Sequence, residues 1–211
     1  MASFEQIDAE NKGISLLCAI FAHFFIAIKR VVGYDESYTV AGNRGGEERS
    51  PGMYPIVKKR VLNETVTLME IQAPLVARKA QPGQFIIFRI DEEGERVPLT
   101  IAGYDRERGT VTIIFQKVGY TTEKLDLLNE GDALLDFVGP LGEPSHTDGI
   151  RRAAVIGGGL GVAIAYPQAK ALHDAGAEVD LIVGFRNEHL IILQDELTAA
   201  CTELTVMTDD G

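Results

Sequence analysis

Cysteine is scarce in this sequence, since only Cys18 and Cys201 occur among its 211 residues. Two cysteines this far apart form no metal or redox motif, and they cannot ligate an iron–sulfur cluster. Cys201 lies on the apolar side of an expected helix, so we expect a small buried side chain there. The histidines His146, His173 and His189 are scattered. No metal site, nucleophile or acid–base pair is therefore predicted.

Basic residues and long hydrophobic runs are also lacking. The chain has 20 Lys and Arg against 31 Asp and Glu, a net charge of −11, which argues against nucleic acid and anionic membrane surfaces as partners. The longest mostly apolar run, residues 14–28, has 15 residues, short of the roughly 20 that span a bilayer. Acidic rather than basic residues precede it, so it does not resemble a signal peptide. We expect no membrane span and a cytoplasmic protein.

The first 52 residues differ from the remainder of the chain. Residues 42–52 are rich in glycine and charge and are typical of an unstructured linker. We expect Met53 to be the natural start and residues 1–52 to be a non-native or disordered extension with a short apolar segment. Two alternatives stay open for the apolar run, which are a helix on a membrane surface and a degraded anchor.

A glycine-rich turn dominates the second half of the chain. Residues 153–157 form a short apolar strand, glycines occupy positions 157, 158, 159 and 161, and a helix is expected to about Ala175. A second apolar strand follows at residues 178–184. This βαβ pattern places a helix N-terminus where it could hold a pyrophosphate. The dinucleotide fingerprint is imperfect because Val162 replaces its third glycine, so a tight turn without a ligand remains the alternative.

Short apolar segments separated by turn signals precede this unit. Six of them are expected to be strands, at residues 56–62, 66–71, 85–90, 96–102, 111–116 and 132–138. A short helix is expected over residues 121–128, with Thr121 or Thr122 as its N-cap. Such a series favours an antiparallel six-stranded Greek-key barrel. We predict a barrel domain at residues 53–150 and an incomplete α/β, Rossmann-like domain at residues 151–211.

Four ordered motifs carry a resemblance to a known family. They are residues 96–100 (Arg-Val-Pro-Leu-Thr), 119–122 (Gly-Tyr-Thr-Thr), 139–142 (Gly-Pro-Leu-Gly) and the glycine-rich loop 157–166. Together they resemble the ferredoxin–NADP reductase superfamily. The Pro-Leu-Thr form, residues 184–187 and the closing residues 208–211 are most similar to the small FAD-carrying subunits of NADH-dependent reduced ferredoxin:NADP oxidoreductase, which are sulfide dehydrogenase-like, and to dihydroorotate dehydrogenase electron-transfer subunits.

The resemblance implies an FAD site on the barrel. It implies that Thr100 hydrogen-bonds the flavin ring near its reactive edge and is the catalytic position. Arg96 offers a charged planar fork for a phosphate. The implied FAD-binding residues are Arg96, Pro98, Leu99, Thr100, Gly119, Tyr120, Thr121 and Thr122. For each, the alternatives of a surface, core or capping residue stay open.

The resemblance also implies an NAD(P) site on the second domain. Its implied residues are Gly157, Gly158, Gly159, Leu160, Gly161, Arg186 and Asn187. No acid occurs within residues 184–187 to bind ribose hydroxyls, whereas Arg186 could meet a 2′-phosphate, which favours NADP. Alternatively, Arg186 is a loop residue and Asn187 caps a helix expected over residues 188–200.

The implied function is electron transfer through FAD between NAD(P)H and an iron–sulfur or ferredoxin-like partner. The implied partners are a larger flavoprotein or iron–sulfur catalytic subunit and a ferredoxin-like carrier. The family continues with further strands and a [2Fe–2S] segment, so we expect a truncated chain with three strands in its second domain and an unpaired sheet edge. A non-catalytic nucleotide-binding module and an inactive fragment remain the alternatives.

Overall fold

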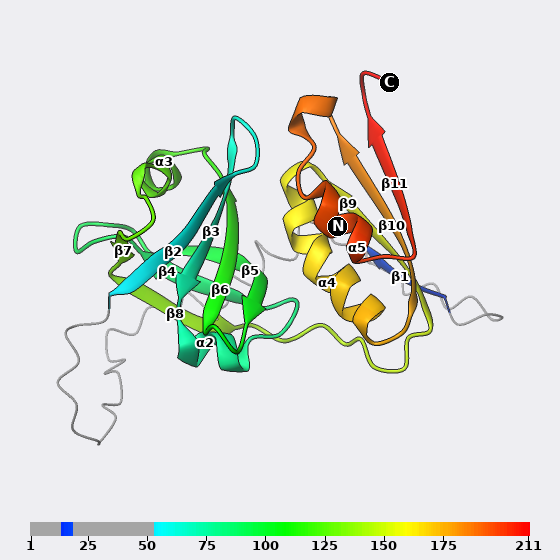
Figure 1. Cartoon of the computed structure of the whole chain (residues 1–211), viewed down its shortest axis with the longest axis horizontal. Coiled ribbons are helices and arrows are strands. Elements are labelled where there is room, and N and C mark those ends of the chain that lie inside the picture. Colours follow the sequence, from blue (N-terminus) through cyan, green and yellow to red (C-terminus); the bar gives the residue numbers. More distant parts are fainter. Residues whose placement is uncertain (1–13, 19–52) are drawn as a thin grey trace, which may run out of the picture. The chain divides into compact units, whose positions relative to one another are not determined.

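The computed structural model describes residues 14–18 and 53–211. These residues form two compact units, one of residues 53–144 and one that combines residues 14–18 with 145–211 (Figure 1). The expectations for residues 1–13 and 19–52, including the linker and most of the apolar run, lie outside the described residues. None of the helices within the described ranges is both long and apolar enough to cross a membrane.

The first unit is an antiparallel sheet of seven strands. They are β2 (Tyr54–Val61), β3 (Val66–Gln72), β4 (Phe85–Arg89), β5 (Val97–Asp105), β6 (Thr110–Gln116), β7 (Ala133–Leu134) and β8 (Asp136–Leu141). Their order across the sheet is β7-β2-β3-β6-β5-β4-β8. The β2–β3 hairpin is set by Asn63, whose side-chain oxygen accepts hydrogen bonds from the amides of Thr65 (3.0 Å) and Val66 (2.9 Å).

One stretch of chain nearly closes this sheet into a barrel. The sequence predicts a single strand over residues 132–138, but Leu135 divides it into β7 and β8, so the strand count is seven and not six. β7 pairs with β2 at one edge, and β8 pairs with β4 at the other. Inside lie fully buried large side chains, among them Phe88, Phe115 and Phe137. The barrel therefore has a single apolar core, as the alternating pattern of the strands predicts.

Two helices accompany the barrel. α2 (Pro74–Lys79) is absent from the sequence prediction; proline occupies its first turn, and Val76 and Ala77 are buried. α3 (Tyr120–Leu127) begins one residue earlier than predicted, with Gly119 as its N-cap in place of Thr121 or Thr122. The expected caps lie inside the helix instead, and the Thr122 hydroxyl accepts a hydrogen bond from the Gly119 amide at 3.2 Å. Thr122 still secures the first turn, but from its third position.

Asp126 fastens the other end of α3 to the barrel. Its carboxylate accepts a hydrogen bond from the Thr67 hydroxyl at 2.5 Å and forms ion pairs with Lys59 (3.8 Å) and Lys117 (3.4 Å). The Lys59 ammonium also donates to the carbonyls of Asp126 and Leu128 near the helix end. Burial raises the pKa of Asp126, but the Thr67 hydrogen bond and the two lysines outweigh it and leave the pKa below its ordinary value.

We expect Asp126→Asn to destabilise the barrel unit by about 1–2 kcal/mol at pH 7, because a charge-assisted hydrogen bond and two ion pairs are lost. Since the folded pKa is lowered, this stabilisation is present above the ordinary carboxyl value of about 4 and is lost as the pH falls through the folded value. Urea unfolding at pH 7 and pH 3 measures the difference. Glu123→Gln, an exposed carboxylate on the same helix, is the control. An equal penalty for Asp126→Asn at both pH values would contradict this assignment.

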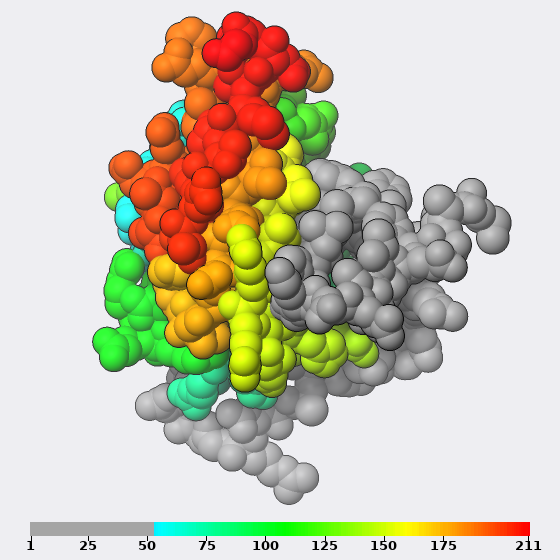
Figure 2. Space-filling view, turned by 90° about the vertical axis from the view of Figure 1, so that its right-hand side faces the viewer, coloured from blue at the N-terminus to red at the C-terminus, as the bar shows by residue number. Residues whose placement is uncertain are grey.

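The second unit is a parallel sheet with helices. Its strands are β1 (Ile14–Cys18), β9 (Arg152–Gly158), β10 (Glu178–Phe185) and β11 (Glu203–Thr208), in the order β1-β9-β10-β11. Figure 2 shows the side of the chain on which β9, β10 and β11 appear in yellow-green, orange and red. α4 (Val162–Asp174) packs on β9 and β10, and α5 (Gln194–Ala199) packs on α4 and β11. Alternate residues of β10, including Val179, Leu181 and Val183, are completely buried. This alternation shows one covered face of the sheet.

Two expectations for this unit are wrong. The three-stranded sheet with an unpaired edge is replaced by four strands, because β1 pairs with the outer edge of β9. The helix expected over residues 188–200 is broken into a 3₁₀ turn, η2 (Glu188–Leu190), and α5. The break lies at Leu193, whose φ of 59° is left-handed and cannot continue a right-handed helix. The apolar spacing of the segment gave no sign of this break.

Candidate functional site

Two guanidinium groups share one carboxylate at the edge of the barrel. Asp136 of β8 accepts a hydrogen bond from Arg89 Nε at 2.7 Å, and Arg96 Nη2 lies 3.3 Å from the same oxygen. Two guanidinium groups share this one carboxylate, while the preceding loop, residues 91–95, adds four acids to the surroundings. The Arg96 side chain is 55% exposed. Its planar fork therefore has donors to spare for an anion such as a phosphate.

The strand after Arg96 presents the predicted ring-binding residues. Within β5, Pro98, Leu99 and Thr100 are all half-buried and pair with Ile87, Ile86 and Phe85 of β4. Leu99 packs against the barrel core. Because successive side chains of a strand point to opposite faces, Pro98 and Thr100 share the face opposite Leu99. Both are partly accessible on that face.

The N-terminus of α3 lies beside the loop that precedes β5. The Thr121 hydroxyl donates to Glu95 at 3.4 Å, and Lys124 forms an ion pair with Asp91 at 2.5 Å. The hydrogen bond from Lys124 lowers the pKa of Asp91, and the same bond raises the pKa of Lys124, so both are charged at neutral pH. The fold thus places the first turn of α3 beside Glu95, the residue before Arg96, although 26 positions separate Thr121 from Glu95 in the sequence.

This part of the barrel suits an elongated anion with a flat ring. The first amides of α3 have no partner within the helix and carry the positive end of its dipole. Tyr120 is 79% exposed beside these amides, with Lys124 Nζ 6.0 Å from its ring centroid. Gly119, Thr121 and Thr122 complete the first turn. Backbone donors and an exposed aromatic side chain are therefore close together at the start of α3.

The glycine-rich loop of the second unit lies between β9 and α4. Gly158 ends β9, a 3₁₀ turn η1 (Gly159–Gly161) follows with Leu160 at its centre, and α4 begins at Val162. Gly159 has a φ of +51°, which favours glycine. A Cβ on Gly157 would lie 3.1 Å from Val162 Cα and 3.0 Å from Ala165 Cβ. Gly157 is thus required for the close approach of α4 to the strand.

These contacts distinguish two neighbouring glycines. We expect Gly157→Ala to destabilise the α/β unit by about 1–3 kcal/mol through overpacking. We expect Gly158→Ala to cost less, because the nearest atom to its Cβ would be the Gly184 oxygen at 4.0 Å. Urea unfolding followed by hydrogen exchange in α4 compares the two variants. Equal losses would refute the packing role assigned to Gly157.

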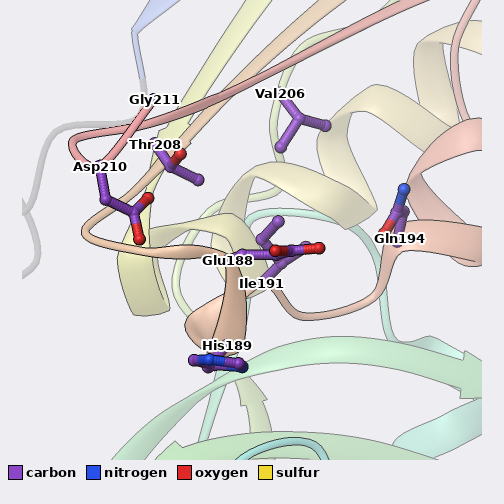
Figure 3. A pocket seen from close by; sticks show the side chains of 8 residues that line it. All are labelled: Glu188, His189, Ile191, Gln194, Val206, Thr208, Asp210 and Gly211. Carbon is purple, nitrogen blue, oxygen red and sulfur yellow. The ribbon is translucent and has the colours of Figure 1, made fainter.

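A cavity of about 820 Å³ opens where β10 and β11 end. It is lined by Glu188, His189, Ile191, Gln194, Val206, Thr208, Asp210 and Gly211 (Figure 3). Figure 3 shows Glu188 from η2 and Asp210 from the segment after β11 among the side chains around it. The carboxyl ends of parallel strands are where ligands bind in α/β sheets. The cavity is therefore the candidate ligand site of this unit.

Sequence reasoning missed the acids of this cavity. It found no acid within residues 184–187, and Glu188, one residue further on, was assigned to a packing helix. Arg186 is exposed and does not line the cavity, whereas the buried Asn187 Oδ1 has no hydrogen-bond partner. Asn187 could supply this acceptor to a ligand hydroxyl. The available signal for this site was the acid Glu188, which lies just beyond the end of the second strand, β10, at Phe185. The helix expected over residues 188–200 concealed it.

The remaining titratable groups give no further site. Cys201 is buried, its thiol donates to the Leu197 carbonyl at 3.1 Å, and burial raises its pKa. Across residues 53–211, no three His, Cys, Asp or Glu side chains gather in a way that could hold a metal ion. His189 lines the cavity. Two candidate sites therefore remain. One is the barrel surface at Arg96 and the start of α3, and the other is the glycine loop together with the cavity at the ends of β10 and β11.

Comparisons with known proteins place these features in context. No family model matches the chain. It is 51% identical over 166 residues to an uncharacterized protein of the adh 3′ region from Clostridium beijerinckii, covering 75% of this chain and 56% of that protein. It is 42% identical over 156 residues to a homologue of the dihydroorotate dehydrogenase B (NAD(+)) electron transfer subunit from Thermotoga maritima, covering 74% and 55%.

Solved structures show the same relationship. The chain matches an NADH-dependent reduced ferredoxin–NADP oxidoreductase structure with a TM-score of 0.72 and 39% identity, covering 77% of this chain and 59% of the other. Phthalate dioxygenase reductase matches with a TM-score of 0.64 and 20% identity, over 75% and 52%, which shows a shared fold. The chain thus spans a little over half the length of the relatives that it matches.

Proposed function

Because the chain is homologous to dihydroorotate dehydrogenase electron transfer subunits and has a ferredoxin reductase-like fold, we propose that it is a flavoprotein oxidoreductase subunit. It passes electrons from NAD(P)H, through FAD, to an iron–sulfur or ferredoxin-like partner. The observation that carries the proposal is the contact between Thr121, in the first turn of α3, and Glu95, the residue before the exposed Arg96. That part of the barrel has the donors that a flavin dinucleotide requires.

On the barrel, the residues fit FAD in type and position. Arg96 and the first amides of α3 bind the phosphates, since both are donors with excess positive charge. Tyr120 stacks on a flat part of the cofactor, and Thr100 donates to the ring from the open face of β5. FAD, when bound, supplies the hydride-accepting and single-electron chemistry. The protein's task is to hold the ring in place and exclude competing donors.

On the α/β unit, the residues fit a pyridine dinucleotide. The amides of Gly158, Gly159, Leu160 and Gly161 meet the pyrophosphate, because no side chain intervenes and α4 begins there. β9 and β10 are paired with Gly158 opposite Gly184, so the adenosine half of the ligand reaches the end of β10. There Asn187 and the acidic cavity accept hydrogen bonds from ribose hydroxyls. The arrangement follows the usual order of a dinucleotide site.

The acids of the cavity favour NADH over NADPH. Glu188 and Asp210 can each accept hydrogen bonds from a ribose diol, whereas a 2′-phosphate would meet two negative charges. Arg186, which pointed to NADP in the sequence, is exposed and outside the cavity lining. We therefore assign NADH as the electron donor, in place of the NADP expected from Arg186.

The electrons leave to another protein. The relatives are named as electron transfer subunits, so we propose a heteromeric assembly with a larger catalytic subunit and a ferredoxin-like carrier. A [2Fe–2S] cluster stays a prediction for the longer family form alone, since the two cysteines of this sequence cannot ligate one. The cytoplasmic location likewise stays a prediction.

The visible spectrum of the purified chain tests the flavin assignment. We expect the absorption bands of a bound flavin. We also expect about one FAD per chain after acid release, because Arg96 and the start of α3 provide one candidate site on the barrel. FMN or substoichiometric riboflavin in place of FAD would contradict the role of Arg96 and α3. A colourless protein that stays colourless after incubation with FAD, yet binds NADH, would favour the non-catalytic binding module. Loss of both ligands would favour the inactive fragment.

A further inference from the structure

The strand β1 comes from a part of the chain where no structural role was expected. It pairs in parallel with β9 over five residues, from Ile14 opposite Arg152 to Cys18 opposite Ile156. More than 130 residues separate the two strands in the sequence. Figure 1 shows β1 in blue at the sheet otherwise formed by β9, β10 and β11. β9 is therefore paired on both sides, although it follows the whole barrel in the sequence.

β1 lies next to the first strand of the sheet, on the side opposite the second strand. β9 carries the glycine loop and is the first strand of the unit after the barrel, with β10 second and β11 third. The observed order, read from β11 to β1, is then third, second, first and an added strand. In doubly wound nucleotide-binding sheets the fourth strand occupies this added position, in the order 3-2-1-4. β1 has both the place and the direction of a fourth strand.

An unpaired β9 would be costly at this place. Its outer amides and carbonyls would form an open parallel edge, which pairs readily with other chains. The edge also borders the crevice beside the first strand, where ligands bind in such sheets. The register places Cys18, the last residue of β1, opposite Ile156, one residue before Gly157. β1 thus extends to the start of the glycine loop.

We propose that residues 14–18 act in the same chain as an added parallel strand of this sheet, beside its first strand β9. They pair with the open edge of β9, stabilise the α/β unit and complete one side of the crevice at the glycine loop. Residues 14–18 are then a working part of the protein, although they lie within the segment expected to be a non-native extension. This inference goes beyond the proposed function, because the pairing stabilises the sheet whether or not a nucleotide binds.

Proline substitution in the full chain tests the pairing. Proline has no amide to donate and is tolerated in an edge strand only where the amide faces solvent. The backbone amides of successive strand residues point to opposite sides, so one of residues 15 and 16 directs its amide toward β9. The double variant Ser15→Pro/Leu16→Pro removes that donor whichever of the two residues carries it. The control is the double variant Glu36→Pro/Ser37→Pro, outside β1. Hydrogen exchange with mass spectrometry then compares peptides of β9, β10, β3 and β6.

We expect amides of β9 to exchange at least about tenfold faster in the β1 variant than in the wild type, with smaller changes in β10 and none in β3 and β6. The control should exchange like the wild type. Unchanged β9 exchange, or an equal change in the control, would overturn the proposal. So would β9 protection that disappears on dilution of the wild type, because the strand would then come from a second copy.

The single variants provide a milder test if the double variant fails to fold. Only one of the residues 15 and 16 directs its amide toward β9, so Ser15→Pro and Leu16→Pro should differ about tenfold in β9 exchange. Equal exchange in the two variants would overturn the pairing. These readouts require neither flavin nor NADH. A failure of this proposal is therefore distinguishable from a failure of the proposed function.

Discussion

Replacing Arg96 by alanine is expected to weaken FAD binding about 10- to 100-fold, because a charge-assisted hydrogen bond to a phosphate contributes about 1.5–3 kcal/mol. The argument rests on an uneven distribution of charge. Asp136 is shared between Arg89 and Arg96, and its shorter contact is with Arg89, at 2.7 Å against 3.3 Å. Loss of Arg96 therefore leaves Asp136 paired, and the barrel should keep its stability.

Fluorescence titration of the apoprotein with FAD measures the affinity, and urea unfolding measures the stability. The control is Arg78→Ala, an exposed arginine on α2. We expect Arg78→Ala to bind FAD like the wild type, and Arg96→Lys to recover part of the loss, since lysine keeps the charge but not the planar fork. Equal affinity of Arg96→Ala and the wild type would remove Arg96 from the cofactor site.

Replacing Glu188 by glutamine is expected to lower the preference for NADH over NADPH about 10- to 100-fold. A carboxylate beside a 2′-phosphate is a like-charge contact that costs several kcal/mol, and its removal relieves NADPH more than it harms NADH. Asp210 remains in the same cavity, so the preference should fall without reversing. The double variant Glu188→Gln/Asp210→Asn should bring the two nucleotides closer still.

The matched control is Glu178→Gln, an exposed glutamate at the opposite end of β10. It makes the same change in net charge, so it separates a local effect from a general decrease in repulsion of the anionic nucleotides. The ratio of kcat/KM for NADH and NADPH is measured with an artificial electron acceptor. A ratio that stays at the wild-type value in Glu188→Gln, or that changes equally in Glu178→Gln, would contradict the assignment.

Local patterns predicted much of the fold. The barrel strands were foreseen because short apolar segments lie between turn signals, and α4 was foreseen because glycines precede an apolar helix. Positions set by contacts distant in sequence were not foreseen. Leu135 is a break in an apolar segment only because β7 and β8 pair with different edges of the sheet. β1 depends on a strand more than 130 residues away.

The candidate site shows the same division. Arg96 and Thr121 were proposed from a family resemblance, and the contact between Thr121 and Glu95 places the start of α3 beside the residue that precedes Arg96. The N-cap was misplaced because threonine is a common cap, whereas here glycine begins α3 and Thr122 bonds back to it. Glu188 was missed because the apolar spacing that follows it suggested one continuous helix. The left-handed backbone at Leu193 instead separates the 3₁₀ turn η2 from α5.

Anaerobic addition of NADH to the FAD-loaded chain tests the central claim most directly. The account predicts that the absorption band of oxidised flavin in the blue part of the visible spectrum bleaches, and that it does so faster with NADH than with NADPH. The band should return when an electron acceptor is added. A chain that holds FAD but is bleached by neither nucleotide, while dithionite bleaches it fully, would contradict the claim that the two units together pass electrons from a pyridine nucleotide to the flavin.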